Sequence, residues 1–510
     1  MKHFLLNVFT LFSCVVFAQD TTAINFANSI KVEDLKEHLY ILASDSLEGR
    51  ETGKKGQKLA ADYIAKHFES IGIAPYNGKT YYQEFPLLKQ TLENSSLVLK
   101  DSLVFLKDYY TSPLFGTTDI SFNKLLCLGY AIEELSCANI KELNIEGKVV
   151  LILTSNLISD KEKATIKNLD AIDWEHQLKV AHQKGAKAVL FVDDGVKDKS
   201  SKYGAYLTKE KNNVHIDKPK FKIPFAFIDV NDLEASIGMS LIKLKKKLSR
   251  CKYPTVRLKG SFSTQVKETL LQGENVLGYL EGSDLKDELL ILTAHYDHIG
   301  IHDGEVHNGA DDDGSGTVAI MELAEAFALA KAAGNGPRRS ILFMPVAGEE
   351  LGLLGSSYYA ENPIYPLENT IADLNIDMIG RMDENHLDKP NYVYLIGADK
   401  LSTELHQISE NANTNYTQLE LDYTFNDPED PNRFYYRSDH YNFAKNNIPV
   451  IFYFNGVHAD YHKATDTVEK IHFGKIASIS KLIFYTAWQL VNQDKRIEVD
   501  VESDFKNTRK

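Results

Sequence analysis

Histidine and acidic residues gather in five short segments of the chain, most of them directly after an apolar run. The segments are His295-Tyr296-Asp297-His298, Asp311-Asp312-Asp313, Glu349-Glu350, Asp377, and His458 with His462. Imidazole and carboxylate groups are common ligands of zinc and similar divalent ions in catalytic sites, and no cysteine lies among these segments. Together these residue types predict a catalytic site for zinc or another borderline divalent ion.

Each segment by itself has an ordinary structural explanation. Asp311 to Asp313 can cap a helix, because acids are favourable at its N-terminal end. Glu349 and Glu350 can begin an exposed helix, and His462 can be a core or surface histidine. The joint occurrence of the segments favours a metal site. Two imidazoles and three carboxylates exceed what one catalytic zinc needs, which predicts two ions about 3.5–4 Å apart with a bridging carboxylate.

Apolar runs alternate with helical patterns from about residue 265 onward, and these elements must position the segments. The expected strands are 289–294, 341–347, 371–376, 392–396 and 450–454, and the expected helices are 317–333, 403–412 and 476–491. Continuous apolar strands alternating with helices indicate an α/β fold with a mostly parallel sheet and helices on both faces. Ligands of such sheets bind outside the carboxyl ends of the strands, where the segments meet.

The chain before residue 265 has two parts of different character. Residues 31–72 show apolar residues at helical spacing, interrupted by a glycine-punctuated loop at 47–53. Farther along are short β-rich runs at 149–153, 188–192 and 225–228, a helix near 177–184, and a lysine-rich, solvated loop at 196–222. The predicted organisation is a leader (1–18), an N-terminal helical segment packing with the catalytic domain (19–99), a smaller α/β domain (100–262), the catalytic domain (263–495) and a polar tail (496–510).

Residues 1–18 have the pattern of a secretory signal peptide. Lys2 precedes a short apolar run, and Val16-Phe17-Ala18 fits a cleavage site before Gln19. A buried N-terminal helix is the alternative, and the bulky Phe12 argues against a lipoprotein signal at Cys14. The sequence thus predicts an exported protein, periplasmic or extracellular. We expect no stable membrane insertion, because no second apolar stretch is long enough to span a bilayer.

Composition excludes several classes of protein. The 510 residues carry 57 Lys and Arg against 71 Asp and Glu, a net charge of −14, whereas binders of nucleic acid or anionic membranes need a basic surface. The length predicts two or three domains. Four cysteines without a CxxC pair are too few for a disulfide scaffold, and a Cys127–Cys137 bond is left open.

In combination, the motifs resemble those of the co-catalytic zinc exopeptidases, which include bacterial leucyl aminopeptidase, glutamate carboxypeptidase and glutaminyl cyclase. The resemblance spans most of residues 31–492. Its motifs are His295-Tyr296-Asp297, residues 309–316, residues 348–352, residues 375–378, Arg437-Ser438-Asp439-His440 and residues 461–467. It implies a phosphorylase/hydrolase-like catalytic domain, and the block at 100–262 is similar to an inserted protease-associated domain.

The resemblance implies two Zn²⁺ ions per chain and a ligand set for each. Asp312, the middle of three acids, would bridge both ions. His295 and Asp377 would complete the protein ligands of one ion, and Glu350 and His462 those of the other.

The resemblance also implies roles for residues that are not ligands. Glu349 would be the general base, and Asp297 would hold His295 in the correct tautomer. Tyr435 stands three residues before the Ser-Asp-His motif and would steady the oxyanion, with Tyr436 as an equal candidate. Asp466 would support His462.

The favoured activity is that of an aminopeptidase acting on peptides with a free N-terminus. Acids around the site favour a substrate ammonium group, whereas a carboxypeptidase needs arginines to hold a terminal carboxylate, and only Arg381 and Arg437 lie near the motifs. The alternatives are a carboxypeptidase of the glutamate-carboxypeptidase type, a glutaminyl cyclase, and a non-catalytic receptor-like ectodomain. A cyclase normally works with one zinc, and a receptor-like chain would lack ligands. The sequence leaves the oligomeric state open.

Overall fold

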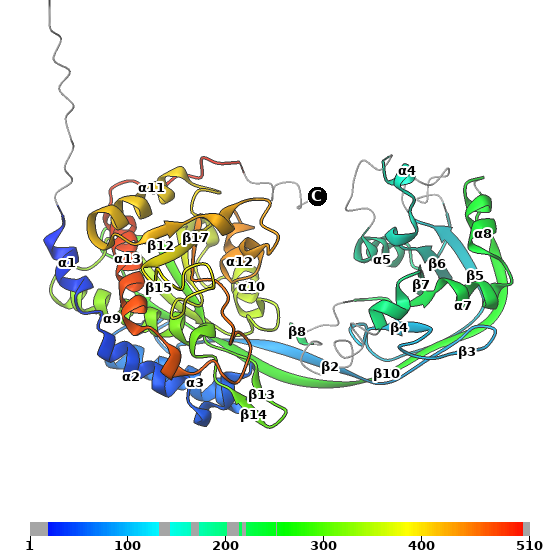
Figure 1. Cartoon of the computed structure of the whole chain (residues 1–510), viewed down its shortest axis with the longest axis horizontal. Coiled ribbons are helices and arrows are strands. Elements are labelled where there is room, and N and C mark those ends of the chain that lie inside the picture. Colours follow the sequence, from blue (N-terminus) through cyan, green and yellow to red (C-terminus); the bar gives the residue numbers. More distant parts are fainter. Residues whose placement is uncertain are drawn as a thin grey trace, which may run out of the picture. The chain divides into compact units, whose positions relative to one another are not determined.

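The computed structural model of the chain describes residues 19–131, 143–164, 173–200, 214–216, 221–250 and 252–502 (Figure 1). The chain divides into two compact units, one of Met1–Phe85 with Gln272–Lys510 and one of Pro86–Leu271. The second unit is wider than the block expected at 100–262, since it begins at Pro86 and ends at Leu271. The predicted signal peptide and Cys137 lie outside the described residues.

An eight-stranded mixed sheet forms the centre of the first unit, in the order β1-β11-β15-β12-β16-β19-β17-β18. Its strands are β1 (Ala74–Pro75), β11 (Gly278–Leu280), β12 (Leu285–His295), β15 (Arg339–Val346), β16 (Thr370–Ile376), β17 (Tyr392–Ile396), β18 (Glu420–Asp422) and β19 (Val450–Phe454). The four central strands, β15, β12, β16 and β19, pair in parallel, as the sequence predicts. Antiparallel pairings of β11 with β15 and of β17 with β19 make the whole sheet mixed.

Helices cover both faces of this sheet (Figure 1). They are α9 (Gly316–Ala332), α10 (Leu354–Glu361), α11 (Thr403–Ala412), α12 (His440–Ala444) and α13 (Phe473–Asn492). One face of β12 packs with α10 and α12 in a cluster that contains Leu289, Ile291 and Tyr359, and α9 and α13 contact the same strand. Every residue of β15, β16 and β19 is buried, which explains their uninterrupted apolar sequences.

The N-terminal helices belong to the first unit. They are α1 (Thr21–Ala27), α2 (Val32–Leu42), the 3-10 turn η1 (Asp45–Arg50) and α3 (Lys55–Ser70), and α1, α2 and α3 pack on α9. The predicted loop at 47–53 falls in η1 and the turn that follows it. Gly49 has a φ of 66°, and a Cβ atom there would lie 2.4 Å from the His307 carbonyl oxygen. Glycine therefore lets this loop approach the catalytic part of the unit closely.

A nine-stranded sheet forms the second unit, in the order β3-β2-β10-β5-β6-β7-β9-β4, with β8 paired to β2. Its strands are β2 (Tyr82–Val98), β3 (Ser102–Leu103), β4 (Tyr109–Thr111), β5 (Thr118–Gly129), β6 (Val149–Leu153), β7 (Ala188–Asp193), β8 (Val214–Ile216), β9 (Phe225–Asp229) and β10 (Thr255–Val276). Its helices are α4 (Asp160–Lys163), α5 (Trp174–Gln183), α7 (Val230–Ile237) and α8 (Leu241–Leu248). The short strands and α5 lie where the sequence predicts them, whereas the long strands β2 and β10 have no counterpart in the prediction.

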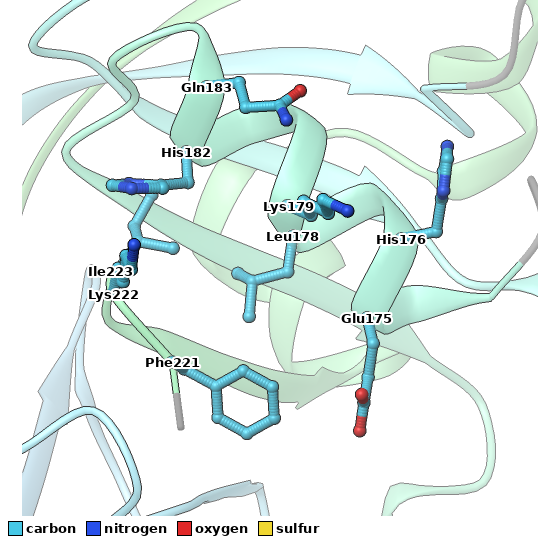
Figure 2. A pocket seen from close by; sticks show the side chains of 9 residues that line it. All are labelled: Glu175, His176, Leu178, Lys179, His182, Gln183, Phe221, Lys222 and Ile223. Carbon is cyan, nitrogen blue, oxygen red and sulfur yellow. The ribbon is translucent and has the colours of Figure 1, made fainter. Parts of the chain in front are cut away.

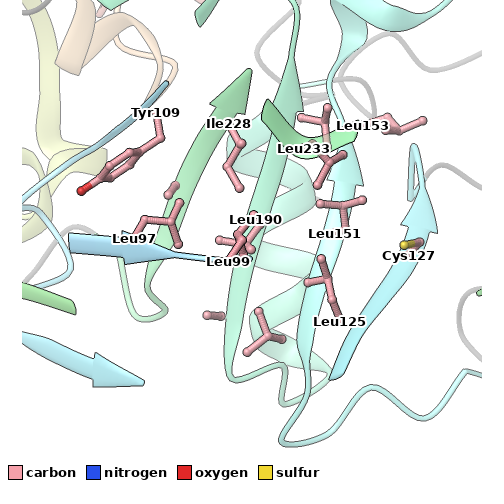
Figure 3. Packing of buried hydrophobic residues seen from close by; sticks show 14 of the residues in the cluster. Leu97, Leu99, Tyr109, Leu125, Cys127, Leu151, Leu153, Leu190, Ile228 and Leu233 are labelled. Carbon is pink, nitrogen blue, oxygen red and sulfur yellow. The ribbon is translucent and has the colours of Figure 1, made fainter. Parts of the chain in front are cut away.

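The core of the second unit is apolar and contains a buried thiol (Figure 3). Leu125, Leu151 and Leu190 from neighbouring strands pack together there. Burial raises the pKa of the Cys127 thiol to about 12, so this group stays protonated and behaves as a small apolar side chain. None of the described helices has the length and apolar character needed to cross a membrane.

Candidate metal centre

The polar segments meet where the central strands of the first sheet end. His295 is the last residue of β12, Asp377 directly follows β16, and Glu349 and Glu350 follow β15 by a few residues. Asp312 comes from the turn η6 (Ala310–Ser315), which leads into α9, and His462 comes from the segment after β19. The structure thus brings all five expected ligands into one centre.

One half of the centre lies around the His295 imidazole. Its Nε2 atom is 3.2 Å from Asp312 Oδ1 and 3.6 Å from Asp377 Oδ1. The Ser438 hydroxyl donates to Asp377 Oδ2 over 2.7 Å, and this bond leaves Oδ1 on the side of His295.

The other half lies around His462. Its Nε2 atom is 3.1 Å from Asp312 Oδ2 and 3.3 Å from Glu350 Oε2. The two carboxylate oxygens of Asp312 therefore face two different imidazoles. A carboxylate that bridges two cations needs this arrangement.

Burial and crowding shift the pKa values in the centre in opposite directions. Burial raises the pKa of Glu349 well above its usual value, and the neighbouring Asp377 and Glu350 add to the rise although His295 opposes it. Burial also acts to raise the pKa of Asp312, but the adjacent His295 and His462 imidazoles hold it well below its usual value. The Asp312 and Glu350 carboxylates raise the pKa of His462 to about 10 despite the opposing effect of burial. The rise at Glu349 reflects the crowding of carboxylates in this buried centre, which a bound cation would relieve.

The residues present fit a divalent metal ion. Asp312 Oδ2 and Glu350 Oε1 are buried, and the nitrogens nearest to them, His462 Nε2 at 3.1 Å and His298 Nδ1 at 2.8 Å, do not make a well-aligned hydrogen bond with them. Buried charged oxygens without partners are costly, and a cation offsets this cost. Two groups of residues each bring three ligand atoms within 4.8 Å of one another. The first group is His295, Glu349 and Asp377, and the second is His298, Asp312 and Glu350. Imidazole nitrogen and carboxylate oxygen together suit zinc.

Removal of the metal is expected to lower thermal stability. An ion present at about 100 times its Kd stabilises the folded chain by about 2.7 kcal/mol, because it binds the folded state alone. Dialysis against a zinc chelator should therefore lower the Tm of the protein by several degrees, and added zinc should restore it. Identical melting curves for the chelated and zinc-loaded protein would contradict a metal ion in this buried centre.

His298 is a further member of the centre, for which the sequence analysis gave no role. It is 1% exposed, and its Nδ1 atom lies 2.8 Å from Glu350 Oε1 and 3.8 Å from Asp312 Oδ2. Its position three residues after His295, just beyond the end of β12, could have indicated this role from the sequence. His298 faces the Glu350 oxygen that His462 does not face, so it adds a third imidazole to the centre.

Asp297 acts on His295 differently from the expectation. The Nδ1 atom of His295 lies 3.0 Å from the main-chain carbonyl oxygen of Asp297 and 3.7 Å from its carboxylate. Donation from Nδ1 to this carbonyl fixes the tautomer that leaves Nε2 free to bind a metal. The carboxylate instead accepts a hydrogen bond from the Glu349 main-chain N–H at 3.3 Å and one from Thr52 at 2.6 Å.

The resemblance implied that Asp466 supports His462, but Asp466 contacts another segment. Its Oδ2 atom accepts hydrogen bonds from the main-chain N–H groups of Asp311 and Asp312, at 3.0 and 3.2 Å. Burial and the neighbouring Asp311 raise the pKa of Asp466 to about 6. Asp466 thus holds the backbone of the acidic turn that carries Asp312.

The tyrosine that faces the centre is Tyr461, not Tyr435. The cavity beside the metal ligands is lined by Tyr461, whose ring centroid is 3.8 Å from that of His462. Tyr435 packs instead against Tyr436 and His440 and is not part of the lining. Burial and the nearby carboxylates raise the pKa of Tyr461, so its hydroxyl remains protonated and can donate a hydrogen bond. The position of Tyr461 directly before the expected ligand His462 could have indicated from the sequence that it lies at the site.

The remaining lining of this cavity is largely apolar. Phe434, Phe452, Phe454, Val457 and Met378 form the apolar part, and Arg437 is its only arginine among the described residues. Carboxylates of Asp312, Glu349 and Asp377 form the polar part. The cavity therefore has an acidic part beside an apolar part, and the apolar part can hold a side chain of a bound molecule.

A second hollow, of about 700 Å³, lies in the other unit. Residues of α5, such as Leu178 and His182, and residues 221–223 line it (Figure 2). Apart from the two groups in the first unit, no three His, Cys, Asp or Glu ligand atoms converge in the described part of the chain. Among the described residues, the candidate metal ligands thus lie in the first unit.

Comparison with known proteins finds relatives of the C-terminal part of the first unit. Residues 275–487 match peptidase family M28, in agreement with the resemblance of the motifs to co-catalytic zinc exopeptidases. Aminopeptidase YwaD of Bacillus subtilis is 25% identical over 272 residues, which are 51% of this chain and 53% of that protein. A probable leucine aminopeptidase of Arthroderma otae is 30% identical over 211 residues, covering 40% of this chain and 54% of that protein.

The matches cover only part of the curated relatives. The chain spans about half of the length of the two aminopeptidases. Aminopeptidase NAALADL1 of Mus musculus is 32% identical over 169 residues, which are 30% of this chain and 22% of that protein. Among solved structures, an aminopeptidase from Aneurinibacillus sp. strain AM-1 has a TM-score of 0.55 at 17% identity, and the match covers 94% of this chain and 99% of that chain. This likeness supports the mixed α/β fold.

Proposed function

We propose that the protein is an exported aminopeptidase with two zinc ions per chain, which removes N-terminal residues from peptides. The observation that carries the proposal is Asp312, whose two oxygens face His295 and His462 at 3.2 and 3.1 Å. A bridging carboxylate next to a further acid, Glu349, is the arrangement that two-ion hydrolysis requires. The similarity to proteins named aminopeptidases supports the choice of substrate end.

The ligand assignment follows the two halves of the centre. His295, Asp312 and Asp377 would hold one ion, and Asp312, Glu350 and His462 the other. When bound, the ions polarise the scissile carbonyl group and activate a water molecule for attack. Glu349 Oε2 is 3.9 Å from His295 Nε2, farther than the nearest oxygens of Asp312 and Asp377. This position fits a base beside the ligands better than a ligand.

Glu349 moves protons in this proposal. Its carboxylate takes a proton from the attacking water and later gives it to the leaving amine, so one group serves as base and then as acid. The main-chain N–H of Glu349 is bonded to Asp297, and this bond fixes the start of the Glu349 side chain relative to His295.

Tyr461 is proposed to donate a hydrogen bond to the oxyanion that develops during attack. Replacing Tyr461 with phenylalanine should lower kcat by about 10²–10³-fold with a smaller change in KM, since the bond forms mainly in the transition state. The matched control is Tyr435→Phe, which removes a hydroxyl outside the cavity and should leave kcat almost unchanged. Steady-state kinetics of both variants decide which tyrosine donates to the oxyanion. A large loss of kcat in Tyr435→Phe with little change in Tyr461→Phe would assign this role to Tyr435.

The positions of the two arginines near the motifs favour binding of the N-terminal end of a peptide over its C-terminal end. Arg381 Nη2 is 2.9 Å from Asp460 Oδ2 and is thereby engaged by an acid of the chain. Arg437 lines the cavity, whose lining also includes the carboxylates of Asp312, Glu349 and Asp377. A substrate ammonium group is favourable in this field, whereas a terminal carboxylate would normally be held by a pair of arginine contacts.

A mixed peptide library tests the proposed function. Half of the peptides carry a free N-terminus and half are acetylated, and mass spectrometry identifies products with and without a zinc chelator. Loss of single N-terminal residues from the free peptides alone, abolished by the chelator, is the expected result. Trimming from the C-terminus of both halves would show a carboxypeptidase, and no cleavage by zinc-loaded protein would contradict peptidase activity.

Export and the inserted domain are parts of the same proposal. The sequence pattern of residues 1–18 supports a cleaved signal peptide, with Gln19 as the first mature residue. The block at 100–262, which lies within the unit Pro86–Leu271, is proposed to be a protease-associated domain. N-terminal sequencing of protein recovered outside the cytoplasm should begin at Gln19, and an intact Met1 would contradict export by this route.

A further inference from the structure

The loop between α2 and α3 contacts the segments that carry the metal ligands. We call residues 45–53 the N-terminal loop. It lies more than 240 residues before His295 in the sequence, and the sequence analysis identified it only as a glycine-punctuated loop. Two of its side chains, Arg50 and Thr52, are almost fully buried, with exposed fractions of 1% and 3%.

Thr52 connects two of the ligand-bearing segments. Its hydroxyl donates to Asp297 Oδ2 over 2.6 Å and accepts from the main-chain N–H of Gly348 over 3.0 Å. Asp297 follows His295 by two residues, and Gly348 directly precedes Glu349. A single hydroxyl therefore joins the segment after β12 to the segment after β15.

Asp297 connects Thr52 to two residues of the centre, His295 and Glu349. Its other carboxylate oxygen, Oδ1, accepts from the Glu349 main-chain N–H, and its carbonyl oxygen accepts from His295 Nδ1. A shift of Asp297 would thus move both His295 and Glu349. Without the Thr52 hydroxyl, one buried oxygen of Asp297 also loses its short hydrogen bond.

Arg50 holds the backbone of the same region. Its guanidinium donates to the carbonyl oxygens of Tyr296, Asn308 and Gly309, at 2.7, 2.6 and 2.9 Å, and to that of Leu42 at 2.6 Å. Tyr296 follows His295, and Gly309 precedes the turn that carries Asp312. Burial of a cation is costly, and here four main-chain hydrogen bonds offset that cost.

We propose that Thr52 and Arg50 are positioning residues of the metal centre. Thr52 fixes Asp297, which in turn orients His295 and Glu349. Arg50 fixes the backbone directly after His295 and directly before the turn that carries Asp312. The effect on turnover rests on the proposed aminopeptidase activity, whereas the effect on metal binding rests only on the metal centre. A loop that merely attaches the N-terminal helices would affect stability alone.

The test compares Thr52→Val with Thr52→Ser and the native protein. Valine keeps the shape and removes the hydroxyl, while serine keeps the hydroxyl. Zinc affinity of the metal-stripped full chain is measured by competition with a chromogenic chelator, and kcat and KM are measured with a peptide that has a free N-terminus. Thr52→Val should weaken zinc binding and lower kcat by about 10–100-fold with little change in KM, and Thr52→Ser should restore both.

A control separates positioning from general stability. Thr486 in α13 is fully buried and donates its hydroxyl to the Leu482 carbonyl oxygen at 2.9 Å. Thr486→Val therefore also removes a buried hydroxyl, and it should lower the Tm without changing zinc affinity. If Thr52→Val does not fold, Arg50→Lys, which keeps the charge but not the planar set of donors, is measured in the same way with the same expected loss.

The outcomes distinguish the two proposals. Weakened zinc binding by Thr52→Val in a protein that cleaves no peptide supports the positioning role and contradicts the aminopeptidase. Native zinc affinity and native kcat in a folded Thr52→Val protein would overturn the positioning role, whatever the change in Tm.

Discussion

Replacing Glu349 with glutamine is expected to lower kcat by about 10²–10⁴-fold while both zinc ions remain bound. Glutamine keeps the size of the side chain but cannot accept the proton of the attacking water. The ligand oxygens come from other residues, so the metal content should not change. Steady-state kinetics and elemental analysis of the purified variant measure the two effects separately.

The neighbouring acid provides the matched control for this variant. Glu350→Gln changes the same chemical group one residue along, but Glu350 Oε2 faces His462 at 3.3 Å and is expected to bind a metal. This variant should lose zinc together with activity. Full activity of Glu349→Gln would exclude the general base, and loss of zinc from that variant would make Glu349 a ligand.

Replacing Asp312 with alanine is expected to release both ions and abolish turnover. Its two oxygens are the shared element of the centre, since one faces His295 and the other faces His462. Zinc affinity should fall by more than the roughly 10–100-fold that loss of an outer partner costs. Chelator competition measures the affinity, and elemental analysis gives the number of ions that remain.

The next acid in the sequence is a strict control for Asp312. Asp313 is equally buried, but its Oδ1 atom accepts main-chain hydrogen bonds from Gly316 and Met378, at 2.9 and 3.0 Å. Burial and the neighbouring Asp377 raise the pKa of Asp313 well above its usual value, so asparagine resembles its neutral form. Asp313→Asn should keep both ions. An Asp312→Ala protein that still holds two zinc ions would contradict the bridging role.

The central strands of the catalytic unit were predictable from sequence because they are buried on both faces. The expected strands at 392–396 and 450–454 and the expected helix at 403–412 have the same bounds in the structure. The long strand β10 left no such signal. Most of its residues are exposed or only partly buried, so no continuous apolar run marks it.

The convergence of the five expected ligands was predictable because motifs at strand ends place their side chains at one sheet edge. The supporting contacts were not, since they depend on backbone direction and on residues distant in sequence. Asp297 orients His295 through its carbonyl oxygen, and Tyr461 rather than Tyr435 lines the cavity. Thr52 reaches Asp297 across 245 positions of the chain, and no local pattern reports such a contact.

A zinc titration of the metal-stripped protein tests the central claim most directly. Cleavage of one peptide with a free N-terminus and of its acetylated twin is followed as zinc is added in known ratio to the chain. The account predicts that cleavage of the free peptide rises to its maximum at two zinc ions per chain, and that the acetylated twin stays intact. Maximal cleavage without zinc, or equal cleavage of both peptides, would contradict a two-zinc aminopeptidase.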